Sequence, residues 1–171
     1  MKKEPVHIIA AVGFLTGCVL GMAGSFVPSE IARNILWAID SGLILAAALL
    51  ALYLSKKGYD IIAAGFLIFA IAESIVFFSC AGDLSVNIPA FGTGVCLWAL
   101  ALAVISSQKL FPLFVRVTGI ISALLFVVTA FQIFTGHPAT ALTKPLPFFA
   151  YPFYAATLGG WAWVVYRKAS F

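Results

Sequence analysis

Residues 59–80 read YDIIAAGFLIFAIAESIVFFSC, an apolar run with one acid, Glu73, deep inside it. The run does not alternate strictly between apolar and polar positions, as a strand of a membrane β-barrel would. A helix of about 20 residues crosses about 30 Å of hydrocarbon and satisfies its own backbone hydrogen bonds without water. The stretch is therefore predicted to be a transmembrane helix.

Five more runs of similar length and composition flank this one, and short connections rich in Pro, Gly, Ser and Lys separate them. The six predicted spans are residues 6–27, 31–54, 59–80, 88–106, 111–134 and 147–166. No connection is long enough to hold a soluble domain. The predicted fold is an all-α integral membrane protein, with residues 1–171 forming a single six-transmembrane-helix bundle with short loops.

The composition supports a lipid environment, because 63% of the 171 residues are hydrophobic and only 9% are charged. Soluble domains are about half apolar and about a quarter charged. A soluble fold of this size could not bury so much apolar surface. The lipid bilayer is thus the expected partner. A nucleic-acid partner is not expected, because no basic segment is interleaved with aromatic residues.

Lysine and arginine predict the orientation of the six spans. With a cytoplasmic N-terminus, the inner side holds Lys2, Lys3, Lys56, Lys57, Lys109, Arg116, Arg167 and Lys168. The outer side then holds only Arg33 and Lys144. This bias over short loops follows the positive-inside rule. It predicts a multi-pass protein of a membrane such as the bacterial inner (cytoplasmic) membrane, with both termini cytoplasmic (N-in/C-in).

An alternative interpretation concerns the first span. Lys2 and Lys3, a short apolar run and the sequence LTGC at 15–18 resemble a lipoprotein signal ending at Cys18. Cleavage there would leave five spans. We favour an uncleaved first span, because the sequence stays apolar as far as Val27, where a processed lipoprotein usually turns polar.

The first span carries Gly13, Gly17 and Gly21 at four-residue spacing. Glycines along one face let another helix approach closely, so that van der Waals contact stabilises the pair. We expect this stripe to pack inside the monomer. A homo-oligomer contact is the alternative.

Two acids, Asp40 and Glu73, lie inside apolar spans. At about 1.5 Å per residue, Asp40 is roughly 14 Å and Glu73 roughly 10 Å from the predicted outer end of its helix. A charge at such depth costs at least about 2.5 kcal/mol, so both should face the protein interior or a water-filled cavity. A short turn connects the two spans, 31–54 and 59–80, so they are predicted to be antiparallel neighbours. Asp40 and Glu73 are therefore predicted to share one site, with Glu73 as the proton carrier.

Other polar and aromatic residues of the same half extend this candidate site. Arg33, Asn34, Trp37 and Ser41 form a stripe with Asp40 along the second span. The remaining candidates are Gln132, Tyr151 and Tyr154. The alternative is that these groups only hydrogen-bond neighbouring helices.

Short matches suggest a weak internal repeat. Leu-Trp-Ala surrounds both Trp37 and Trp98, and Gly-Trp-Ala surrounds Trp161. Three parallel helical hairpins would follow, although such short matches arise easily by chance in so apolar a chain.

No metal, cofactor or catalytic residue is expected. The sequence has no HExxH, CxxC or Walker motif, and neither His7 nor His137 lies deep in a span as a haem ligand would. Cys18, Cys80 and Cys96 are interpreted as small buried hydrophobic residues.

Three functions remain as hypotheses. The first is a transporter, or another membrane protein that binds a small or amphipathic ligand. Its outward-facing polar pocket would be lined by both acids, and binding could be coupled to proton exchange. The second is a non-catalytic structural subunit that helps to assemble a larger membrane complex. The third and weakest is an intramembrane enzyme that uses the acids as general acid and base.

Overall fold

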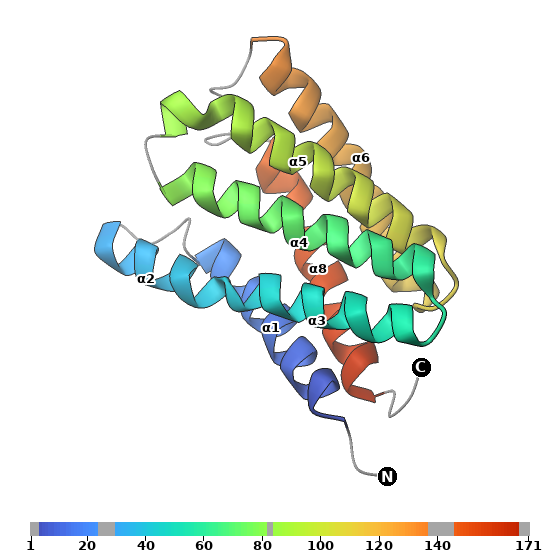
Figure 1. The fold of residues 1–171 in the computed structure, drawn as a ribbon. Coiled ribbons are helices and arrows are strands. Elements are labelled where there is room, and N and C mark those ends of the chain that lie inside the picture. Colours follow the sequence, from blue (N-terminus) through green and yellow to red (C-terminus); the bar gives the residue numbers. More distant parts are fainter. Residues whose placement is uncertain (1–3, 24–29, 82–83, 137–145, 168–171) are drawn as a thin grey trace.

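The computed structural model describes residues 4–23, 30–81, 84–136 and 146–167, and within these ranges every regular element is a helix. The helices, labelled as in Figure 1, are α1 (Pro5–Ala23), α2 (Glu30–Asp40), α3 (Gly42–Lys56), α4 (Asp60–Ala81), α5 (Leu84–Ser107), α6 (Leu113–Phe134) and α8 (Leu146–Arg167). No strand occurs in the described part of the chain. The predicted all-helical class is confirmed at this level.

Four stretches of the described chain are long and apolar enough to cross a membrane: Asn34–Lys56, Asp60–Cys80, Asn87–Ser107 and Leu113–Phe134. In α1 the apolar stretch is shorter, Pro5–Leu20. The sequence of α8 mixes tyrosine, threonine, glycine and proline with its apolar residues. Most of its second half is buried against other helices, so it needs less apolar surface than a helix that faces lipid.

The predicted second span, 31–54, is divided into α2 and α3 at Ser41. The Ser41 hydroxyl donates a 2.6 Å hydrogen bond back to the carbonyl oxygen of Ala38. Ser74 and Ser79 bond back to their own helix in a similar way while α4 continues, so this bond alone does not account for the division. Ser41 keeps right-handed helical dihedral angles, φ −56° and ψ −18°, and the apolar stretch Asn34–Lys56 runs through it. The break follows Asp40 immediately.

The long helices form a closed ring in chain order. Helix α1 packs on α3, α3 on α4, α4 on α5, α5 on α6, α6 on α8, and α8 returns to α1 (Figure 1). The short α2 lies against α1. Contact between the first and last helices closes the ring, so each of its six members has two neighbours.

Aromatic side chains fill the ring. The fully buried Trp161 of α8 lies at the centre, with its ring centroid 4.9 Å from Phe66, 5.3 Å from Phe69 and 5.6 Å from Phe14. All three pairs meet edge to face, the arrangement that the ring quadrupoles favour. Helices α1, α4 and α8 are thus joined through one tryptophan.

The glycine stripe of α1 faces α3. A Cβ atom added at Gly13 would meet Ala46 and would lie 2.7 Å from the carbonyl oxygen of Gly42. One added at Gly17 would press on the side chain of Leu43. The surroundings of Gly21 lie outside the described part of the structure. Close approach of α1 and α3 therefore depends on the missing side chains at Gly13 and Gly17.

We expect Gly13→Leu to lower the free energy of unfolding by at least about 1–3 kcal/mol, because the new side chain must displace backbone. Gly17→Leu should cost less, since the flexible end of Leu43 can move aside. Val19→Leu is the matched control, because Val19 is 60% exposed on the same helix. Thermal melting of the purified variants measures the effect, and equal melting temperatures for Gly13→Leu and Val19→Leu would contradict it.

Cationic side chains gather at one end of the ring. The beginning of α1, the α3–α4 turn, the α5–α6 turn and the end of α8 all lie there (Figure 1). These elements carry Lys56, Lys57, Lys109, Arg116 and Arg167. Arg116 also donates hydrogen bonds to the carbonyl oxygens of Ser106 and Ser107, and so binds α6 to the end of α5.

Candidate functional site

The Glu73 carboxyl group of α4 is buried inside the ring and accepts a hydrogen bond from the hydroxyl group of Tyr154 on α8. Only 9% of Glu73 is exposed. A carboxylate removed from water is costly unless hydrogen bonds or charges compensate it. This bond joins two helices that are not neighbours in the ring, so Glu73 and Tyr154 cross its interior.

Aromatic rings surround the Tyr154 side of the pair. The Tyr154 ring lies 5.3 Å from Trp98 of α5, 5.6 Å from Phe126 of α6 and 6.3 Å from Tyr151. The Trp98 indole lies near the Glu73 carboxyl group, and its Nε1 completes no hydrogen bond within the described residues. Aromatic side chains therefore surround the Glu73 carboxyl group. One of them, Trp98, has an N–H group with no hydrogen-bond partner among the described residues.

Asp40 approaches the same place from the break between α2 and α3. Its carboxyl group lies close enough to Glu73, Tyr151 and Tyr154 to interact with them electrostatically. Its Oδ1 atom is buried and has no hydrogen-bond partner in the described part of the chain. Trp98 Nε1 and Gln132 Oε1 are in the same position within the described residues, so this oxygen does not by itself mark a bound group.

The structure brings together four of the predicted site residues: Asp40, Glu73, Tyr151 and Tyr154. Of the remaining predicted residues, Asn34 and Ser41 are exposed on the surface of the second span. Gln132 is half-buried, and its Oε1 has no partner among the described residues. The side chains of Arg33 and Trp37 lie outside the described part of the structure.

Trp98 is the site residue that the sequence analysis did not include. Its sequence context, Leu-Trp-Ala, had singled it out only as part of a weak repeat. Counting residues from the α4–α5 connection gives no signal, because Trp98 lies 14 residues after the start of α5 and Glu73 only 8 residues before the end of α4. The sequence around an aromatic residue in an apolar run does not indicate whether its side chain lies near an acid.

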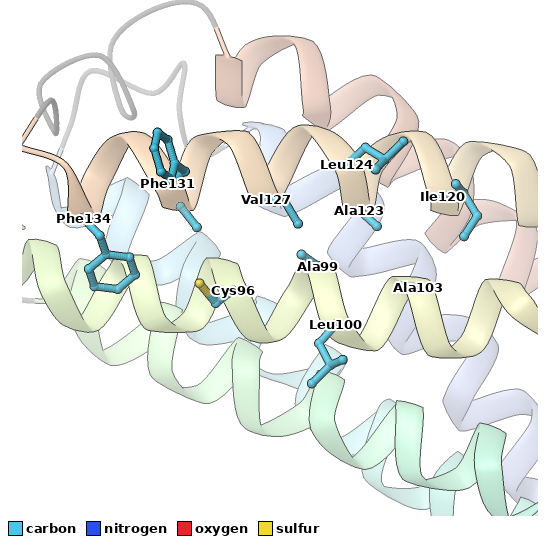
Figure 2. Close-up of a pocket in the computed structure, with 11 residues that line it drawn as sticks. Cys96, Ala99, Leu100, Ala103, Ile120, Ala123, Leu124, Val127, Phe131 and Phe134 are labelled. Carbon is cyan, nitrogen blue, oxygen red and sulfur yellow. The ribbon is translucent and has the colours of Figure 1, made fainter.

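An apolar groove lies elsewhere, on the outer surface between α5 and α6 (Figure 2). It encloses about 560 Å³, and its walls include Ala99 and Ala103 of α5 and Val127 and Phe131 of α6. Cys96 is exposed in this groove, so the expectation that it is buried was wrong. The small side chains of α5 and α6 leave this space because they do not fill the gap between the helices.

The described residues contain no group of three or more histidine, cysteine or acidic side chains that could hold a metal ion. Cys18, Cys80 and Cys96 are free thiols, and the Cys18 thiol donates to the carbonyl oxygen of Ala155 at 3.3 Å. Comparison of the chain with protein-family models, with curated proteins and with solved structures finds no match.

Proposed function

We propose that the chain is a six-span membrane protein with both ends cytoplasmic. Its apolar helices support this placement, as do the large apolar side chains exposed around the ring, such as Phe78, Leu113 and Phe131. Exposing so many large apolar side chains to water is unfavourable, whereas exposing them to lipid chains is not. The gathering of cations at one end supports the orientation, because that end then meets the cytoplasm.

Cysteine labelling tests this topology. After removal of the native cysteines, cysteines introduced at Lys57 and Gln108 should be protected from an impermeant thiol reagent in intact cells. Cysteines at Asp83 and Ala139 should react, because the proposed orientation puts them outside. Labelling at Lys57 in intact cells would overturn the orientation, and permeabilised cells provide the control for reactivity.

Within this frame we propose a binding site for a small ligand at Asp40 and Glu73, coupled to proton exchange at Glu73. The hydrogen bond between buried Glu73 and Tyr154 is the observation that carries the proposal, together with the Asp40 Oδ1 atom, which has no partner among the described residues. Burial and a nearby second acid both favour the protonated form of a carboxyl group, and acids inside transmembrane segments commonly mark proton or ion pathways. The aromatic rings of Trp98, Phe126 and Tyr151 would supply the apolar walls.

A ligand screen tests this function. Purified protein in detergent is melted in the presence of a panel of small cations, amines, acids and amphipathic molecules, since a ligand that binds the folded state raises the melting temperature. A ligand of this site should stabilise the wild-type protein and fail to stabilise Glu73→Gln. Asp60→Asn, which removes an exposed carboxyl group at the start of α4 and outside the Glu73–Tyr154 pair, serves as a charge control. A ligand that stabilises wild type and Glu73→Gln equally binds elsewhere.

The groove between α5 and α6 favours a second candidate, a structural subunit whose partner helix fills the groove. The α1 glycine stripe is not available for this role, since Gly13 and Gly17 pack on α3. Ala103→Phe should fill the groove and release such a partner, because Ala103 lines the groove and is only partly buried, whereas Glu73→Gln should leave the assembly intact. The mass of the detergent-solubilised complex, measured by light scattering for both variants, separates the two candidates.

A further inference from the structure

A second pocket, away from the acids, lies where the α5–α6 turn meets the last turns of α8. It has a volume of about 370 Å³ and is formed by Lys109, Leu110, Phe111, Pro112, Trp163, Val164 and Arg167. Its floor is apolar, and its two ionisable side chains, Lys109 and Arg167, are both cationic. Among the residues that the structure describes, no carboxylate lines it. Two cations that converge on one pocket from separate elements attract an anion.

The α6 helix adds to this positive potential. It begins at Leu113 beside the pocket, and Pro112 provides no side-chain cap for its first turn. The first backbone bond at this end runs from the Arg116 amide to the Pro112 carbonyl oxygen. The amides before Arg116 therefore have no acceptor within the helix, and the positive end of the helix dipole faces the pocket.

Aromatic and apolar side chains surround the cations on the side that would face lipid. The Arg167 guanidinium lies 4.8 Å from the centre of the Trp163 ring, and Trp163 in turn lies 6.1 Å from the ring of Phe114. Trp163 is 43% exposed and Leu113 71% exposed. Tryptophan beside arginine or lysine is the arrangement found where a membrane protein meets the headgroup layer.

We propose that this pocket binds the phosphate group of an anionic phospholipid, with the acyl chains lying over Leu113, Phe114 and Trp163. A free phosphate would use only the cations and the α6 amides, whereas a lipid also covers the exposed apolar side chains beside them. The site lies at the cationic end of the ring, where the proposed orientation places anionic lipid of the cytoplasmic leaflet. The proposal rests on the membrane placement and is independent of the Asp40–Glu73 site.

Competition between two lipids tests it. Full-length protein is exchanged into micelles with equal amounts of dioleoylphosphatidylglycerol and dioleoylphosphatidylcholine, and the retained lipid is counted by native mass spectrometry. We expect wild type to prefer phosphatidylglycerol about 25-fold, because each of the two cations near the headgroup contributes a factor of about five. Lys109→Ala and Arg167→Ala should each reduce the preference about fivefold, and Lys109→Arg should keep it.

Lys56→Ala is the matched control, since Lys56 lies at the same end of the ring in the last turn of α3 but outside the pocket. It should leave the preference unchanged. An equal loss in Lys56→Ala and Lys109→Ala would overturn the pocket in favour of diffuse attraction by all the cations. Stabilisation of the lipid-free protein by inorganic phosphate to the same extent as by phosphatidylglycerol would overturn the lipid as ligand.

Discussion

Replacing Trp161 by alanine is expected to lower the free energy of unfolding by about 3–5 kcal/mol, as for other large-to-small core substitutions. Trp161 is fully buried at the centre of the ring, where it contacts Phe14, Phe66 and Phe69 from two other helices. Inside a membrane, helices are held together mainly by such packing, because lipid chains are as apolar as the side chains themselves. The cavity left by the indole would remove those contacts at once.

Trp163→Ala is the matched control for this change. It removes the same side chain two residues further along α8, but Trp163 is half exposed and faces outward from the ring. We expect it to melt close to wild type. Reversible unfolding in detergent measures both variants. If Trp161→Ala were no less stable than Trp163→Ala, the closed ring around a tryptophan centre would be the wrong packing.

The second large effect is expected at Glu73, on function more than on stability. Glu73→Gln keeps an oxygen that can accept the Tyr154 hydrogen bond, so the fold should persist, while every step that needs a proton on this side chain should be lost. Glu73→Leu instead strands the buried Tyr154 hydroxyl, at a cost of about 1–3 kcal/mol.

A double-mutant cycle separates this bond from general packing. Tyr154→Phe removes the hydroxyl alone, and Glu73→Leu with Tyr154→Phe removes both partners, which should recover part of the stability lost in Glu73→Leu. Melting measurements on the four proteins give the coupling between the two side chains. Strictly additive effects would show that Glu73 and Tyr154 do not act as a pair.

The sequence predicts the helical class and the approximate bounds of the helices, because apolar runs of membrane length have few other solutions. It does not predict the division at Ser41, since serine is common in transmembrane helices, and Ser74 and Ser79 bond back to the backbone without dividing α4. The sequence also does not predict the contact between α1 and α8 that closes the ring. That contact joins opposite ends of the chain, and no local pattern encodes it.

The candidate site shows the same division. Depth along the helices suffices to group Asp40, Glu73, Tyr151 and Tyr154 in one half of the protein, because rise per residue is constant. Which side chains meet depends on the rotation of each helix about its axis. The bond between Glu73 and Tyr154 and the approach of Trp98 depend on that rotation, which an almost uniformly apolar helix does not reveal.

Infrared difference spectroscopy tests the central claim, that Glu73 exchanges a proton within the proposed binding site at Asp40 and Glu73. Spectra of the reconstituted protein are compared between acidic and alkaline buffer for wild type, Glu73→Gln and the surface control Asp60→Asn. The account predicts that one component of the protonated-carboxyl C=O signal changes in wild type and Asp60→Asn and is missing from Glu73→Gln, whereas Asp40 keeps its own signal in all three proteins. The same band in Glu73→Gln as in wild type would contradict it.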